Sequence, residues 1–68
     1  AKADDWEAVF GRLKANREKA AEQLDLEAAI ITSKASMESF AYAEPEERTE
    51  ELRDRLFLPW QQALLFPS

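Results

Sequence analysis

The sequence predicts an all-α fold, and three observations support this prediction. Good helix formers dominate the composition, namely Ala, Glu, Leu, Lys, Arg and Gln. A single Gly and three Pro in 68 residues leave few tight turns. The pattern typical of strands, β-branched and aromatic residues alternating between turn clusters, is missing. We therefore expect one small helical domain over residues 1–68: a three-helix arrangement followed by a short helical turn after Pro59.

The first predicted helix covers residues 5–23. Apolar residues recur at intervals of three and four from Trp6 to Leu24, which marks one face of a helix. A second stripe, out of phase with the first, begins at Leu26 and predicts another helix over residues 26–43. Asp25 is the expected N-cap of that second helix, because its carboxylate can accept from free backbone N–H groups. One continuous helix through this region is the alternative.

The remaining helices are predicted from prolines and charge order. Pro45 followed by acidic residues is a helix-start signature, and a third helix is expected over residues 45–57. Pro59 cannot continue that helix, because it lacks an N–H group and its ring clashes with the preceding turn. A short last helix over residues 60–65 is expected to follow.

Composition excludes several classes of protein. The chain has neither Cys nor His, which rules out disulfides and the common ligand sets for zinc and haem. Its net charge of −5 argues against nucleic-acid binding, which requires clustered Lys and Arg. No apolar run approaches the length of a membrane span, and no signal peptide is visible. We expect a cytoplasmic protein.

The same composition argues against catalysis. The usual general bases and nucleophile partners are missing, because they rely on His and Cys. Glu47, Glu51 and Asp54 share one helix edge, an arrangement that attracts hard cations, but three arginines interleave with the acids of that segment. A solvated charged face is the preferred interpretation. We expect a non-enzymatic protein with no catalytic, cofactor or metal site.

The C-terminal segment is the most informative part of the chain. Seven large apolar residues lie between Leu56 and Phe66, too many for a small domain to leave in water. The i, i+4, i+8 spacing of Leu56, Trp60 and Leu64 predicts that these three point into the core. The side chains expected to contact a partner are Phe57, Gln62, Leu65 and Phe66.

One motif lies inside this segment. The stretch from Gln62 to Phe66, Gln-Ala-Leu-Leu-Phe, resembles the short peptide with which bacterial polymerases and repair factors dock on the sliding clamp. The resemblance implies that Gln62 occupies an edge site while Leu65 and Phe66 fill an apolar pocket. Ala63 departs from the usual Leu, and the similarity covers five residues only.

These observations favour a small protein-interaction module, such as an accessory subunit, an adaptor or an inhibitor. It would dock through its apolar C-terminal segment and its helical faces. Two alternatives stay open. One is a self-associating structural protein that buries its apolar excess in a homo-oligomer, and the other is an accessory protein of the bacterial sliding clamp.

Overall fold

A computed structural model describes residues 2–67, and every regular element in that range is helical. The prediction of an all-α fold is confirmed. The elements are α1 (Trp6–Leu24), α2 (Ala28–Ile31), α3 (Lys34–Tyr42), the 3-10 helix η1 (Pro45–Glu47), α4 (Glu50–Leu56) and α5 (Pro59–Leu65). Within residues 2–67, each helix is too short or too polar to cross a membrane.

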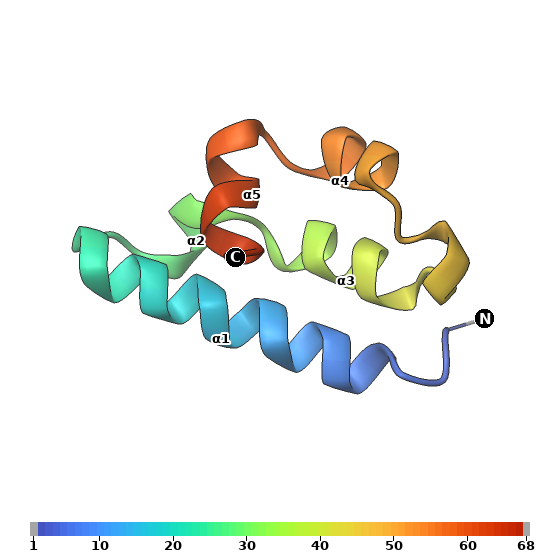
Figure 1. Ribbon diagram of the computed structural model, residues 1–68. Helices are drawn as coiled ribbons and strands as arrows, with labels where there is room; N and C mark the ends of the chain where they lie inside the picture. Colours follow the sequence, from blue (N-terminus) through green and yellow to red (C-terminus); the bar gives the residue numbers. More distant parts are fainter. Residues whose placement is uncertain (1, 68) are drawn as a thin grey trace.

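The helices are arranged around the long helix α1. In Figure 1, α2 and α3 run back along α1 in the opposite direction, while α4 and α5 lie above them. The last turn of α5 descends again toward α1, so that α1 packs against α2, α3 and α5. The C-terminal segment is thereby enclosed by the rest of the domain rather than extended from it.

The predicted break between the first two helices is confirmed, but the role of Asp25 is different. Asp25 has φ 56° and lies in the left-handed region directly after α1. Its N–H donates to the Glu22 carbonyl, and the N–H of Leu26 donates to the Ala21 carbonyl, which is a Schellman motif. The prediction that Asp25 caps the second helix is wrong: Asp25 ends α1, and the chain is extended at Glu27 before α2 begins.

The prediction of one helix over residues 26–43 is also wrong. Thr32 and Ser33 are extended and separate α2 from α3. The Ser33 hydroxyl accepts from the Ser36 N–H at 3.1 Å, so Ser33 is the N-cap of α3. The guanidinium of Arg17 donates to the Thr32 carbonyl at 3.2 Å, which satisfies a backbone acceptor released by the break. A capping Ser and an arginine from α1 together offset the lost helical hydrogen bonds.

The third predicted helix, over residues 45–57, is divided in the same way. Pro45 does start a helical turn, as predicted, but η1 ends at Glu47 and α4 begins at Glu50. Thr49 is the N-cap of α4, because its hydroxyl accepts from the Leu52 N–H. The short last helix exists, and it begins at Pro59, one residue earlier than predicted.

The core consists of two neighbouring clusters of buried side chains. The larger cluster joins α1, α3 and the C-terminal segment through Leu13, Met37, Phe40, Phe57 and Leu65. The smaller one joins α1 and α2 through Ala20, Ala21 and Ile31, with Leu64 of α5 packed against it. Both clusters lie on the same side of α1, and both need α5 to cover them.

Arg48 holds the N-terminal end of the domain together. Its guanidinium donates to both carboxylate oxygens of Asp5, and also to the backbone carbonyls of Phe40 and Ala41. Next to it, the N–H of Ala3 donates to the Tyr42 carbonyl at 3.1 Å. We call the Asp5–Arg48 ion pair with its two carbonyl contacts the clasp. It joins the start of α1 to the end of α3 through Arg48, the residue at which η1 ends.

Candidate functional site

Most of the C-terminal segment belongs to the core. Phe57 and Leu65 are 2% and 1% exposed, and Phe66 is half-buried beside them. The rings of Phe40, Phe57 and Phe66 form a triangle with centroid distances between 5.2 and 6.2 Å, all in tilted or edge-on geometry. Leu65 is fixed further by its carbonyl, which accepts from the Asn16 side-chain amide at 2.8 Å.

The predicted division of the segment into inward and outward residues is only partly correct, since Leu56 and Leu64 pack against the core clusters as expected. Trp60, expected in the core, is 47% exposed, whereas Phe57 and Leu65, expected at a partner, are among the most buried residues. The cause is the backbone at Phe57 and Leu58, which is extended at both residues. Side chains four residues apart share a face only within one continuous helix. Two extended residues interrupt the helix between Leu56 and Trp60, so these two side chains do not lie on one face.

The residues of the clamp-like motif have contacts inside the domain. The Gln62 side-chain amide donates to the Asp54 carboxylate and to the Phe57 carbonyl, both at 3.1 Å. Leu65 is buried and Phe66 packs against the core cluster. Docking of this motif in a clamp pocket would therefore require α5 to leave its place.

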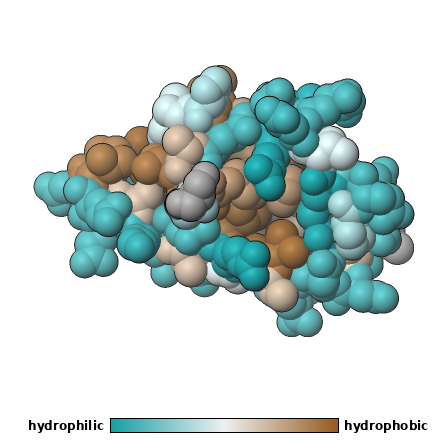
Figure 2. Space-filling model, in the orientation of Figure 1, coloured by the Kyte–Doolittle hydropathy of each residue, from teal (hydrophilic) through white to brown (hydrophobic). Residues whose placement is uncertain are grey.

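Large apolar side chains are exposed instead at the opposite end from the clasp. They belong to the end of α1, to α2 with the turn before it, and to the start of α5; in Figure 1 the first two lie at the left end of the domain, and the start of α5 lies above them. We call this surface the apolar end; its members, each between 43% and 58% exposed, are Leu24, Leu26, Ile30, Leu58 and Trp60. Figure 2 shows apolar side chains gathered at the left end of the visible face.

Gln61 ties the two helices of the apolar end to each other. Its side-chain oxygen accepts from the Leu58 N–H at 2.7 Å, and its amide nitrogen donates to the Ile31 carbonyl at 2.9 Å. The first contact restrains the first turn of α5, and the second fixes that turn against the end of α2. Gln61 thus links the two elements that carry Trp60 and Ile30.

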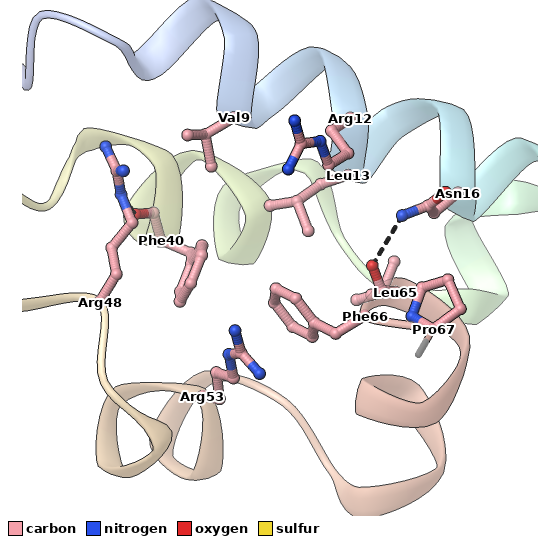
Figure 3. A pocket seen from close by; sticks show the side chains of 10 residues that line it. All are labelled: Val9, Arg12, Leu13, Asn16, Phe40, Arg48, Arg53, Leu65, Phe66 and Pro67. Carbon is pink, nitrogen blue, oxygen red and sulfur yellow. Dashed lines mark hydrogen bonds between the residues drawn. The ribbon is translucent and has the colours of Figure 1, made fainter. Parts of the chain in front are cut away.

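A cavity of about 630 Å³ lies between α1, α3, α4 and the C-terminal segment. Figure 3 shows its walls, which combine apolar side chains with three arginines. The lining residues are Val9, Arg12, Leu13, Asn16, Phe40, Arg48, Arg53, Leu65, Phe66 and Pro67. Near the centre of the face in Figure 2, apolar side chains show between hydrophilic ones.

The three arginines of the cavity differ in what they bind. Arg48 is engaged by the clasp, and in Figure 3 its guanidinium points away from the other two. The Arg53 guanidinium stacks on the Phe66 ring at 4.1 Å from the centroid. Its buried Nε has no hydrogen-bond partner among the described residues. Arg12 is exposed at the wall formed by α1, and no described residue forms an ion pair with it.

Two sites have perturbed titration. The hydrogen bond from Arg48 holds the pKa of the Asp5 carboxyl below its ordinary value, and the same contact raises the pKa of Arg48. Burial raises the pKa of Tyr42, and a hydrogen bond to Glu38 adds to the effect. Both sites lie at the clasp end; the Asp5–Arg48 contact joins two segments of the chain, whereas Tyr42 and Glu38 both belong to α3.

Carboxylates do not gather into a metal-binding group anywhere in residues 2–67. Glu51, one of the acids considered for a hard cation, pairs with Arg55 at 3.0 Å, and Asp54 accepts from Gln62. These contacts fit the preferred interpretation of a charged surface.

Comparisons with known proteins add no relatives: no family model, no curated protein and no solved structure matches the chain. Sequence reasoning missed the exposed Leu24, Leu26, Ile30 and Leu58, and it missed Arg12 and Arg53 beside the cavity. The signal for Leu58 was its place before Pro59, which favours an extended residue outside any helix.

Proposed function

We propose that the chain is a small non-enzymatic protein-interaction module that docks on a partner protein through the apolar end. The observation that supports this is the exposure of five large apolar side chains on three neighbouring elements. A domain of this size has few such side chains to spare, since its own stability depends on burying them. A partner protein that binds at this end would bury these side chains.

Trp60 is the best candidate for the central contact. Tryptophan is enriched among interface residues whose truncation costs most of the binding energy, and Trp60 is 47% exposed. Its helix is held in place by Gln61, so docking would not require ordering of a flexible segment. A preorganised aromatic anchor of this kind is typical of specific interfaces.

The charges around the apolar end indicate the chemistry of the partner. Glu22, Asp25 and Glu27 are exposed in and beside the turn that carries Leu24 and Leu26. A matching surface would present an apolar groove bordered by Lys or Arg. The same acids disfavour contact between two copies of this chain, whose net charge is −5.

The test compares two sets of substitutions in the full chain. In the first, Leu26, Ile30 and Trp60 are each replaced by Ser; in the matched control, the exposed residues Ala8 and Ala15 are replaced by Ser. We expect both proteins to keep their helical circular dichroism. The wild type and the control should bind a common partner from the source cell, and the purified pair should show at least a tenfold loss of affinity for the triple variant.

Sedimentation over a wide concentration range tests the homo-oligomer alternative. If the wild type forms dimers or larger species at micromolar concentrations, and the triple variant is monomeric, the apolar end is a self-association surface and the homo-oligomer replaces our proposal. Equal binding by the triple variant and the wild type would show that the partner uses another surface.

A further inference from the structure

The cavity described above is separate from the apolar end, and one part of its wall is apolar. Leu13, Phe40 and Leu65 are buried side chains that reach its wall, and the ring of Phe66 closes one side. Its volume of about 630 Å³ lies within the range of about 300 to 1,000 Å³ that is usual for small-molecule sites. An apolar group of several carbons can therefore be accommodated without rearranging the core.

The charge of the cavity is opposite to that of the chain. The sequence holds 14 acidic residues against 9 basic ones, yet no Asp or Glu lines the cavity, whereas three Arg do. Asp5 compensates the charge of Arg48. Arg12 and Arg53 make no ion pair with any described residue, so two positive charges face the cavity without a counter-charge.

The position of Arg53 defines where an anion would lie. In Figure 3 it extends from α4 toward the space between Phe40 and Phe66, while Arg12 reaches out from α1 on the far wall. Stacking on Phe66 fixes the plane of the Arg53 guanidinium and leaves its terminal N–H groups as donors. A guanidinium held in this way is suited to bind a carboxylate through two parallel hydrogen bonds.

From these observations we propose that the cavity binds a small organic monocarboxylate with an apolar body. The carboxylate pairs with the terminal N–H groups of Arg53, and Arg12 adds attraction at the mouth. The apolar body lies along Phe40, Leu65 and Phe66. The carboxylate can belong to a free organic acid or to the last residue of a peptide that ends in an apolar side chain, because both present the same groups.

The proposal is tested by titrating the isotopically labelled chain with 4-phenylbutyrate and with its neutral amide, followed by amide-proton NMR. We expect chemical-shift changes around the cavity and a dissociation constant roughly tenfold lower for the acid than for the amide, since a charge-assisted hydrogen bond is lost with the amide. A short peptide that ends in phenylalanine, with a free or an amidated C-terminus, is the second arm. Binding by the acid alone, or by the free peptide as well, distinguishes the two sources.

Three single substitutions assign the contacts. Arg53→Met should weaken acid binding about tenfold and leave binding of the amide nearly unchanged. Arg12→Met, on an exposed side chain whose loss spares the fold, should weaken acid binding by about threefold, with a smaller effect at high salt. Arg55→Met is the matched control on α4, because Arg55 lies outside the cavity and pairs with Glu51.

Each of the following outcomes would overturn the proposal. The acid and the amide bind equally, the shift changes fall outside the cavity, or Arg55→Met weakens binding as much as Arg53→Met does. If Arg53→Met fails to fold, the acid-to-amide ratio of the wild type and the effect of Arg12→Met decide the question on their own.

Discussion

The two ends of this domain are closed in different ways. At the clasp end, Arg48 satisfies Asp5 and two backbone carbonyls, and Trp6 packs edge-on against Tyr42 with ring centroids 5.2 Å apart. At the apolar end, a side-chain amide from Gln61 and a guanidinium from Arg17 each reach one carbonyl, and five large apolar side chains are exposed.

The difference shows where stability and binding are located. The clasp is directional and consists of groups that need each other, because an unpaired buried charge is costly. At the apolar end the large side chains that are exposed contribute little to folding. A surface that contributes little to stability is free to be selected for binding, whereas the clasp end is not.

The largest loss of stability is expected from a substitution in the core beneath the apolar end. Ile31 is fully buried and Ile30, its neighbour in the short helix α2, is 56% exposed. Replacing Ile31 by Ala should lower the free energy of unfolding by about 2 to 5 kcal/mol, which approaches the whole stability of a domain this small. Ile30→Ala should change it by less than about 1 kcal/mol. Urea unfolding of both variants measures the difference.

These two residues provide a matched control, since both are Ile on one helical turn. A similar loss for both would mean that Ile30 is buried in solution, as it would be in a homo-oligomer, and the apolar end would then not be free. A small loss for both would show that α2 is not packed on α1.

The second-largest loss of stability is expected from a substitution in the clasp. Arg48→Met keeps much of the apolar stem but leaves the Phe40 and Ala41 carbonyls without their donors. We expect a loss of about 2 kcal/mol in the free energy of unfolding, because removing a donor leaves buried acceptors unsatisfied. Lys34→Met is a suitable control on an exposed cation. If Arg48→Met is neutral, the clasp end is held by packing alone.

The clasp also predicts a pH dependence. Because the hydrogen bond from Arg48 lowers the pKa of Asp5 in the folded state, its contribution to stability is complete above the ordinary value of 3.8 and is lost as the pH falls below it. Asp5→Asn should therefore be less stable than the wild type at pH 7, and the difference should shrink below about pH 4. Thermal melts of both proteins across this pH range test the prediction. A difference in stability that does not change with pH would show that the Asp5 carboxylate does not stabilise the fold through Arg48.

The sequence predicted the fold class and most helix positions because helix propensity, apolar periodicity and proline act locally. The breaks at Thr32–Ser33 and Arg48–Thr49 were missed, since each depends on a distant partner: Arg17 reaches the first break, and Asp5 holds Arg48 at the second. A capping Ser or Thr was present at both, but either residue also occurs inside helices.

The candidate site was predicted less well than the fold. Counting the large apolar residues of the C-terminal segment correctly showed that much of it must be covered. The assignment of faces was wrong for Phe57, Trp60 and Leu65, because the chain is extended at Phe57 and Leu58 and the helical phase changes there. Arg12 and Arg53 lie far apart in the sequence and line the same cavity only because of the tertiary packing, so sequence periodicity could not relate them.

The smallest expected change in the free energy of unfolding concerns Asp25, in the turn between α1 and α2. Asp25 is in the left-handed region, which an L-residue with a Cβ enters at a cost, and its carboxylate lies at the negative end of the α1 dipole. Asp25→Gly should therefore stabilise the domain by about 0.5 to 1 kcal/mol, with part of the gain offset by the greater freedom of Gly in the unfolded chain. Asp25→Ala removes the charge but keeps the Cβ, so it should gain less than Gly or lose stability. Urea unfolding of the three proteins gives the ranking, and a more stable Ala than Gly variant would mean that α1 continues through this turn as one helix with α2. Since the turn carries Leu24 and Leu26, the Gly variant should also leave partner binding intact, which would show that the apolar end can be made more stable without losing its exposed side chains.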